Sequence, residues 1–460
     1  MNRRTLTREK LSMTRRVATT LLAALLTLGG LLLVPGTASA AVSSAPPATP
    51  QIGGSATSGT DGTVEVVRQI TQCGNMMYAV GSFSQVRNPN SNTPIARSNA
   101  FAFRATAPYT VSTTWVPNPN GQVDTVECAP DGDIYLGGSF STAGGATVRN
   151  LTKVDEVTGL AVPGFALQPA GRVAHVELVT PTGGVPHLLV GRYSAPYLRS
   201  LNPTTGVGDT YAVPAISGTY QYPDVVAQTP RVYNMTVSPD GQAVLMTGIF
   251  TSVGGQRHEQ VFRLNLGATS SAVSAWSPSE LYQHCFRRQP FYAQDAAWST
   301  DMSQVFVVST GYRLDSEFAL PATQRPQVRT GPCDAAIAYQ ATNQAEFSGH
   351  TWINYTGCDS LYAVAADAST VFIAGHQRWI SNGQRCDALG PAPARAQSGL
   401  GELTPTSGAD QPGPNRGRGL GANDLLRTSA GLWIGSDNQA NTAGCGTVQG
   451  GRMGICFLPN

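Results

Sequence analysis

The sequence predicts an all-β fold assembled from seven repeated units of four antiparallel strands. The first observation is the composition: 50 glycines and 31 prolines in 460 residues, with 13% charged residues, favour short strands and tight turns over helices. The second is a heptapeptide that occurs twice, as YAVGSFS at 78–84 and YLGGSFS at 135–141. The third is a longer unit around this heptapeptide, which recurs along most of the chain.

The repeated unit is most complete in its second copy, GQVDTVECAPDGDIYLGGSFSTAGGATVRNLTKVDEVTGLAVPGF. An alternating strand runs to a Pro-Asp-Gly turn, and a second strand ends in Gly-Ser-Phe. A Gly-Gly loop, a third strand, a Thr-Gly turn and a fourth strand follow. The fourth copy, which begins VYNMTVSPDGQAVLMTGIFTSVGG, keeps this order, and fainter copies contain LLVGRY, FVVSTGY, FIAGHQRW and LWIGSDN. The glycines near the ends of the second strands are Gly81, Gly138, Gly191, Gly248, Gly311, Gly375 and Gly435.

Seven such units at a regular spacing are typical of a β-propeller, because one small twisted sheet cannot bury both of its faces alone. We therefore predict a seven-bladed β-propeller over residues 63–460. The last copy ends at its third strand, so we expect a strand near Gly59 to Val67 to supply the missing fourth and close the ring. The rest of 41–62 is rich in Pro, Ser, Gly and Thr and is expected to be a flexible linker.

Residues 1–40 are predicted to be an export signal. Two arginines precede the apolar run 17–34, and the small residues Ala-Ser-Ala precede Ala41, which is the pattern of a cleavable signal peptide. The run is also long enough for an uncleaved anchor, and Met13 would make a more ordinary start. No later segment is apolar enough to span a bilayer. We expect a secreted, extracellular protein, with association with the cell surface left open.

The charge pattern argues against a nucleic-acid binder. The chain has 30 Lys+Arg and 28 Asp+Glu, but the first 40 residues hold six of the basic residues and one acid. The remainder has 24 basic and 27 acidic residues, far from the strongly basic balance of such proteins. Lys153 is the only lysine beyond residue 40, which leaves almost no candidate for Schiff-base chemistry.

All eight cysteines follow the predicted signal, and an even count in an exported chain favours disulfides. There is no C-x-x-C pair and no closely spaced histidine pair, so we expect no metal and no cofactor. Placing the cysteines on the repeats predicts that neighbours along the chain are paired. The predicted pairs are Cys73–Cys128, Cys285–Cys333, Cys358–Cys386 and Cys445–Cys456. The main alternative joins Cys386 to Cys445 and leaves Cys358 and Cys456.

Several stretches carry a resemblance to a known family: GHQRW at 375–379, WINYTG at 352–357, GLWIGSDN at 431–438 and GICFLP at 454–459. The chain resembles secreted actinobacterial β-propellers built from roughly sixty-residue "GSF" repeats, which are similar in style to kelch repeats. The resemblance covers nearly the whole chain after the signal. It implies a secreted propeller and carries over no reaction.

A candidate ligand site is expected on one face of the propeller. The loops that follow second strands and those that precede first strands share this top face, and those of the fifth to seventh units contain arginines, histidines and an indole. With acids from first strands they suit an anionic or sugar-like ligand. A structural explanation is also open, in which the acids accept backbone N–H bonds from a neighbouring blade. The candidate residues are His284, Arg288, His376, Arg378, Trp379, Arg416, Asp295 and Asp424.

Three functions fit these observations. The first is a secreted recognition module that binds a glycan, an anionic ligand or a protein on its top face. The second is an extracellular carbohydrate-active hydrolase or lyase; no G-x-S-x-G elbow is present, but paired carboxylates are open because sequence does not give their separation. The third is a structural cell-surface protein. We expect a monomer that binds neither nucleic acid nor, once the signal is removed, membrane.

Overall fold

The computed structural model divides the chain into two units, Met1–Ala38 and Ser39–Asn460. All described residues belong to the second, so the predicted export signal lies outside them. No helix among them is long and apolar enough to cross a membrane. The described residues are 42–43, 46–54, 65–168, 170–220, 227–282, 292–311, 331–342, 344–357, 359–383, 388–414, 421–437 and 454–460.

Strands and turns dominate the second unit, and the one helix in its described part is the short 3₁₀ helix η1 (Ser279–Tyr282). Seven antiparallel sheets, here called sheets 1 to 7 in chain order, carry the repeated units. Their strands are β2 (Val66–Cys73), β3 (Met76–Ser82) and β6 (Ala100–Arg104) in sheet 1; β7 (Val123–Cys128), β8 (Ile134–Gly138) and β11 (Leu151–Val154) in sheet 2; β12 (Val173–Val179), β13 (His187–Arg192) and β14 (Leu198–Leu201) in sheet 3; β16 (Arg231–Val237), β17 (Ala243–Ile249), β20 (Val261–Leu266) and β21 (Ser271–Val273) in sheet 4; β22 (Tyr292–Trp298), β23 (Gln304–Thr310), β24 (Ala335–Gln340) and β25 (Trp352–Tyr355) in sheet 5; β26 (Leu361–Ala366), β27 (Val371–Gly375), β30 (Leu400–Leu403) and β31 (Asp410–Gln411) in sheet 6; and β32 (Ala422–Thr428), β33 (Gly431–Ser436) and β34 (Ile455–Pro459) in sheet 7.

Shorter strands form small sheets beside the main ones, and most lie where the repeat has its loop between second and third strands. They are β1 (Gln51–Gly53), β4 (Gln85–Arg87) and β5 (Ile95–Ala96); β9 (Thr142–Ala143) and β10 (Ala146–Thr147); β15 (Ile216–Ser217), β18 (Ser252–Val253) and β19 (Gln256–Arg257); and β28 (Trp379–Ile380) and β29 (Arg395–Ala396).

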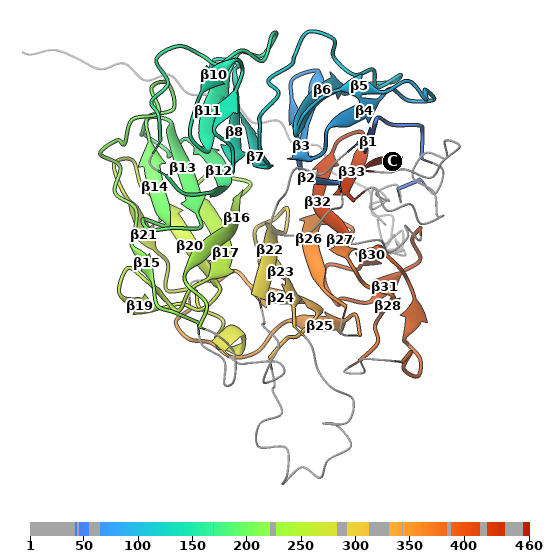
Figure 1. Cartoon of the computed structure of the whole chain (residues 1–460). Helices are drawn as coiled ribbons and strands as arrows, with labels where there is room; N and C mark the ends of the chain where they lie inside the picture. The colour runs from blue at the N-terminus through green and yellow to red at the C-terminus, as the bar shows by residue number, and fades with distance from the viewer. Residues whose placement is uncertain are drawn as a thin grey trace, which may run out of the picture. The chain divides into compact units, whose positions relative to one another are not determined.

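The first strands of the seven sheets contact one another in cyclic order. β2 contacts β7, which contacts β12, and the series continues through β16, β22, β26 and β32, which in turn contacts β2. Figure 1 shows these strands facing a common centre, with the later strands of each sheet further out. None of the seven sheets closes on itself. The fold is therefore all-β and propeller-like.

The predicted fourth strand is present in only part of the molecule. Sheets 4, 5 and 6 have four strands within the described residues, whereas sheets 1, 2 and 3 have three. In those three sheets the fourth strand is reduced to one isolated bridge, because only a single residue pair keeps ladder geometry with the third strand. The bridges are Phe103–Val111, Val154–Ala161 and Leu201–Gly208.

A β-bulge interrupts every first strand next to the end of the second strand. The glycine there is required by close contact: a Cβ on Gly81 would lie 1.9 Å from the Val66 carbonyl oxygen, and one on Gly248 would lie 2.2 Å from that of Arg231. A bulge places one extra residue on its strand and re-aims that side chain. The bulge residues are Arg68, Asp124, Ala174, Tyr233, Gln294, Tyr362 and Asn423.

The hydrophobic core lies between neighbouring sheets, so each sheet buries both faces. Between sheets 1 and 7, for example, Trp433 stacks on Phe457 with ring centroids 4.3 Å apart. The same indole meets Phe103 of sheet 1 edge-on at 5.5 Å. All three side chains are buried, so this core joins the first sheet to the last.

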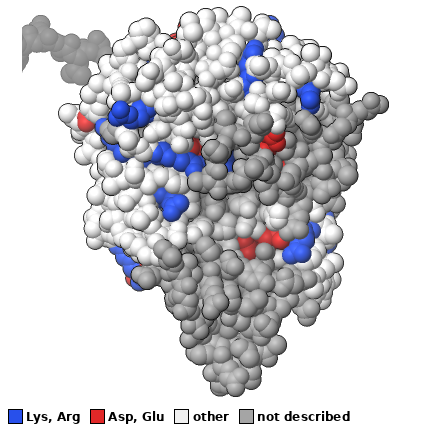
Figure 2. Space-filling model, viewed as in Figure 1, with Lys and Arg blue, Asp and Glu red and all other residues white. Residues whose placement is uncertain are grey.

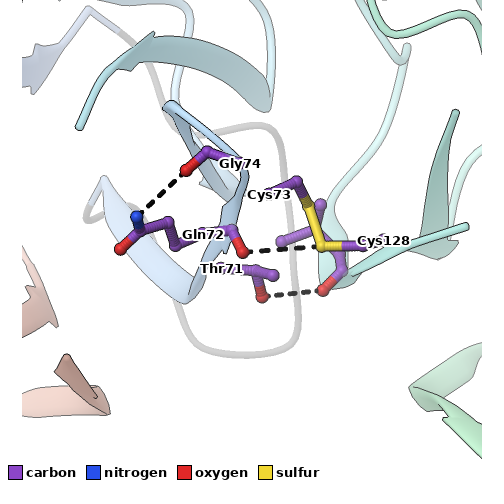
Figure 3. The surroundings of a disulfide bond; sticks show 6 residues. Thr71, Gln72, Cys73, Gly74 and Cys128 are labelled. Atoms are coloured by element: carbon purple, nitrogen blue, oxygen red, sulfur yellow. Dashed lines mark hydrogen bonds between the residues drawn. A yellow bond between two sulfur atoms is a disulfide. The ribbon is translucent and has the colours of Figure 1, made fainter. Parts of the chain in front are cut away.

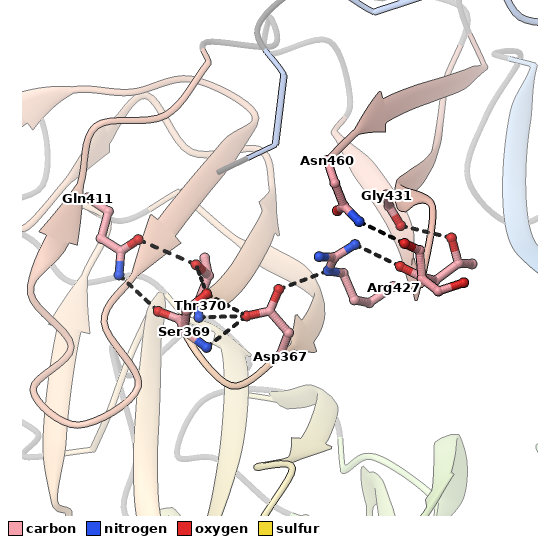
Figure 4. A network of polar contacts seen from close by, with 9 residues as sticks. Asp367, Ser369, Thr370, Gln411, Arg427, Gly431 and Asn460 are labelled. Atoms are coloured by element: carbon pink, nitrogen blue, oxygen red, sulfur yellow. Dashed lines mark hydrogen bonds and ion pairs between the residues drawn. The ribbon is translucent and has the colours of Figure 1, made fainter. Parts of the chain in front are cut away.

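Polar contacts also connect neighbouring sheets, as Figure 4 shows for sheets 6 and 7. Asp367 lies in the turn between β26 and β27, where one carboxylate oxygen accepts N–H bonds from Ser369 and Thr370 at 2.8 and 2.9 Å. Its other oxygen accepts a bond from Arg427 Nε of β32 at 2.9 Å. One carboxylate therefore shapes a turn and links it to the next sheet.

The segment before sheet 1 differs from the expected linker. Ser43 N–H donates to the Pro459 carbonyl at the outer edge of β34, at 2.6 Å, and Val42 is buried in the core of sheets 6 and 7. Thr49 Oγ1 donates to the Ile455 carbonyl at 2.6 Å. A ring-closing strand was expected near Gly59 to Val67; Val66 and Val67 belong to β2, and 55–64 lie outside the described residues. The edge of sheet 7 is therefore covered by an earlier part of the segment.

One predicted disulfide is confirmed. Cys73 and Cys128 end the first strands of sheets 1 and 2 and are bonded, with Cα atoms 5.8 Å apart (Figure 3). Beside them, Thr71 Oγ1 donates to the Val126 carbonyl at 2.9 Å. Cys333 and Cys456 are also disulfide-bonded, with partners outside the described residues. The pairings 285–333, 358–386 and 445–456 therefore stay predictions.

Candidate functional site

The first strands surround a cavity of about 870 Å³. All seven bulge residues contribute to its wall, so the bulge is the feature of the repeat that points side chains inward. Residues beside the bulges and at the ends of second strands complete the wall. The lining residues are Val66, Arg68, Gln69, Asp124, Arg172, Ala174, His175, Tyr193, Arg231, Tyr233, Asn234, Tyr292, Gln294, Tyr362, His376, Asn423 and Asp424.

The residue after the bulge has a different role, because in four sheets its side chain accepts a backbone N–H from the next sheet. Such bonds fix the spacing of the first strands around the cavity. The final one, from sheet 7 to sheet 1, completes the cycle. The bonds are Val126 N to Gln69 Oε1 at 2.8 Å, Val176 N to Thr125 Oγ1 at 3.2 Å, Val364 N to Asp295 Oδ2 at 2.9 Å and Ile70 N to Asp424 Oδ2 at 2.6 Å.

Two arginines approach the ring of Tyr193 on one side of the cavity. Arg172 donates from Nε and Nη2 to the two oxygens of Asp124 at 2.7 and 2.6 Å, which is a bidentate ion pair. The guanidinium carbon of Arg172 lies 4.5 Å from the Tyr193 ring centroid, and that of Arg231 lies 5.4 Å from it. Cation–π attraction therefore holds both arginines against this ring.

Three tyrosines continue this cluster across sheets 3 to 5. Tyr193 meets Tyr233 edge-on at 6.3 Å, and Tyr233 meets Tyr292 at 6.0 Å. Burial raises the pKa of all three phenols, so each keeps its proton at neutral pH. Within the described residues no group hydrogen-bonds to these hydroxyls, which leaves three donors in the cavity wall.

Arg231 differs from Arg172 in its partners. Its Nη2 donates to Gln228 Oε1 at 3.4 Å, its buried Nε has no hydrogen-bond partner, and no carboxylate of the described chain forms an ion pair with it. Arg68, also in the wall, donates to Asn423 Oδ1 at 3.4 Å. Three arginines face two aspartates in the wall, so the cavity favours an anion. Figure 2 shows mostly uncharged residues on the described part of the face in view.

Buried acids and a histidine lie among the residues after the bulges. Burial raises the pKa of Asp424 to about 6 and lowers that of His175 to about 4. His175 Nε2 lies 3.3 Å from Glu177 Oε2, and burial raises the pKa of the Glu177 carboxyl. At neutral pH this contact therefore joins a neutral imidazole to a carboxyl group that resists ionisation, so it is a hydrogen bond and not an ion pair.

The residues expected to form a top-face patch are only partly brought together. His376 and Asp424 line the cavity, whereas Asp295 accepts bonds from Ala296 N, Val364 N and the Asn234 amide and is not a lining residue. Asp295 and Asp424 thus make the contacts of the structural explanation, in which each accepts a backbone N–H bond from a neighbouring sheet.

Arg378 and Trp379 lie outside the cavity wall. Arg378 Nε donates to Asp359 Oδ2 at 2.6 Å, and its guanidinium lies 4.2 Å from the Trp379 ring centroid, so the two side chains are occupied with neighbours. His284, Arg288 and Arg416 lie outside the described residues.

The main cavity residues were missed by sequence reasoning, although a signal for them exists. The repeat glycines mark the second strands and direct attention to the loops, where most of the candidate residues lie. Aligning the first strands instead, as GRVAH, RVYNM, FYAQD and SLYAV, places arginines and tyrosines at one common position or two residues before it. That position is the bulge. The residues found this way are Arg172, Arg231, Tyr233, Tyr292 and Tyr362.

No family model and no curated protein matches the sequence. The structure is similar to several solved structures at very low sequence identity. U3-55K is 8% identical, with a TM-score of 0.49 over 90% of this chain and 100% of that chain. The WD40 β-propeller domain of Doa1 is 9% identical (TM-score 0.44; 85% and 94% covered), and BamB from Moraxella catarrhalis is 12% identical (TM-score 0.40; 84% and 97%). Matches at this level say nothing about what this chain binds.

Proposed function

We propose that this chain is a secreted recognition module, a single seven-bladed β-propeller that binds an anionic ligand in its central cavity. The blade number is supported by the seven bulged first strands and by their cyclic contacts. Export is supported by the apolar run 17–34 and by the Cys73–Cys128 disulfide, since such bonds persist in oxidising compartments. The resemblance to the actinobacterial "GSF" repeat proteins belongs to this proposal.

The main support for an anionic ligand is the difference between the partners of Arg172 and those of Arg231. Asp124 neutralises Arg172 through two hydrogen bonds, while Arg231 has no carboxylate partner among the described residues and its Nε is buried without a hydrogen bond. A buried donor without a partner costs free energy. An anion in the cavity would give the Arg231 guanidinium the carboxylate-like acceptor that the described residues do not supply.

The contacts of the wall carboxyls favour binding over hydrolysis. A paired-carboxylate mechanism needs one carboxyl group as acid and another as base or nucleophile. Of the two aspartates in the wall, Asp124 is held by Arg172 and Asp424 accepts the Ile70 N–H. Both carboxyls are therefore engaged in holding the wall.

The test is binding of an anionic and neutral glycan panel to the chain from residue 41 onward, followed by Arg231→Gln. We expect anionic glycans to bind and the substitution to weaken them about 10- to 100-fold, the worth of one charge-assisted hydrogen-bond set. Arg257→Gln is the matched control, because Arg257 is exposed and paired with Glu259. Binding of neutral glycans alone, or of anions unchanged in Arg231→Gln, would contradict the proposal.

A further inference from the structure

We infer that the ligand is a sugar carrying a single carboxylate, bound with its carboxylate on Arg231 and its ring over Ala174. This inference rests on the proposed function and narrows it from anions in general to acidic saccharides. Three features of the cavity carry it: the space, the charge and the unpartnered hydroxyls.

The space is set by the bulge residues. Six of the seven have polar side chains of at least aspartate size, and the exception is Ala174 in sheet 3. Its neighbours around the axis are Asp124 of sheet 2 and Tyr233 of sheet 4, since β12 contacts both β7 and β16. The cavity wall therefore leaves the most room for a ligand at Ala174, on the side where Arg172, Tyr193 and Arg231 come together. Cavities of roughly 300–1,000 Å³ hold ligands of drug-like size, so about 870 Å³ accommodates a short saccharide.

The charge favours a monoanion. With Arg172 neutralised by Asp124, Arg231 is a cation of the cavity wall that forms no ion pair with a carboxylate among the described residues. A carboxylate carries one negative charge and can accept two parallel N–H bonds from a guanidinium. A phosphate monoester carries about −1.5 to −2 at neutral pH, which exceeds the single charge of Arg231.

The hydroxyls favour a sugar over an apolar acid. Tyr193, Tyr233 and Tyr292 each present a protonated phenol in the wall. Enclosing them against an apolar ring would leave these donors unpaired, which sites of this kind penalise strongly. A ring with several hydroxyl groups can both accept from and donate to them.

The experiment is calorimetric titration of the chain from residue 41 onward with four probes: trigalacturonate, triglucuronate, maltotriose and mannose 6-phosphate. We expect one or both carboxylated trisaccharides to bind and the neutral and phosphorylated sugars to bind at least about tenfold more weakly. Arg231→Gln should lower the affinity for the carboxylated sugar about tenfold or more. Tyr193→Phe, Tyr233→Phe and Tyr292→Phe should each lower it severalfold.

Ala174→Phe tests the position of the ring, because it fills the room left at Ala174 without changing charge and should abolish binding. Ala174→Val adds less volume and is expected to weaken binding partially. It serves as the test if phenylalanine at this position disturbs the fold. Circular dichroism reports whether both variants are folded. Trisaccharide binding that survives Ala174→Phe in a folded protein would overturn the placement of the ring. Binding of mannose 6-phosphate but not the uronates, lost in Arg231→Gln, would overturn this inference and leave the proposed function intact. If no anion of any class binds, both fail.

Discussion

At the scale of single residues, the fold places ionisable groups where water cannot reach them. Asp295 accepts three N–H bonds, and burial raises its pKa to about 7 from an ordinary value of 3.8. Between these two values the unfolded state has lost the proton that the folded state keeps. The free energy of unfolding therefore falls as pH rises from about 4 to about 7, and this contribution is constant above pH 7.

Asp295→Asn should flatten this dependence, because the amide does not titrate. The substitution removes one acceptor and should lower stability, but the slope between pH 4.5 and 7, at most about 1.4 kcal/mol per pH unit for one proton, should decrease. Urea unfolding at a series of pH values measures it. Asp301→Asn is the control, since Asp301 is a turn residue whose pKa is lowered to about 2 by hydrogen bonds from Ser299 and Ser303. A slope unchanged in Asp295→Asn would contradict the argument.

At the scale of elements, neighbouring sheets are linked by side chains as well as by the apolar core. One carboxylate oxygen of Asp367 accepts a backbone N–H bond within its own turn, and the other accepts a hydrogen bond from Arg427 of sheet 7. Asp367→Asn keeps an oxygen for the turn and replaces the one facing the arginine. The substitution therefore isolates the contact between sheets.

We expect Asp367→Asn to lower the free energy of unfolding by about 1–2 kcal/mol, because both partners of the ion pair are mostly buried and the guanidinium loses a charged acceptor. Chemical denaturation gives the value. Glu259→Gln breaks a pair in which Glu259 is buried but Arg257 is exposed, and it should cost less because water can solvate the freed guanidinium. An equal decrease in the free energy of unfolding in the two variants would show that the ion pair between sheets 6 and 7 stabilises the protein no more than the Arg257–Glu259 pair does.

The elements also show how far the sequence was informative. The second strands and their glycines could be predicted, because alternation and turn residues are local signals. The bulges could not, since a bulge exists only in relation to the partner strand, and Tyr233 or Arg68 points into the cavity only because of it. The fourth strands expected in sheets 1 to 3 are shorter than predicted: in sheet 2, for example, Ala161 pairs with the third strand at a single position.

At the scale of the whole molecule, covalent links follow the order of the sheets. The Cys73–Cys128 bond joins sheets 1 and 2, as predicted from the ends of their first strands. Cys333 and Cys456 are bonded to partners outside the described residues, which already excludes a bond between these two.

Peptide mapping under non-reducing conditions should recover Cys285–Cys333, Cys358–Cys386 and Cys445–Cys456 in addition to the observed bond. The reason is proximity: each pair falls within one repeat or at its end. Reduction should cost about 2–4 kcal/mol for each bridge, measured as a shift in unfolding with and without reductant. A Cys386–Cys445 peptide would establish the alternative pairing instead.

The contacts between the early segment and β34 have a consequence for the order in which the chain folds. Thr49 and Ile455 are 406 positions apart, so a chain that emerges from its N-terminal side presents one partner long before the other exists. During that interval the edges of sheet 1 and of the early segment are unpaired and open to strands of other chains. We therefore expect the unfinished polypeptide to depend on holding factors until its last strand has been made. Pairing of the early segment with β34 then becomes a late step of folding.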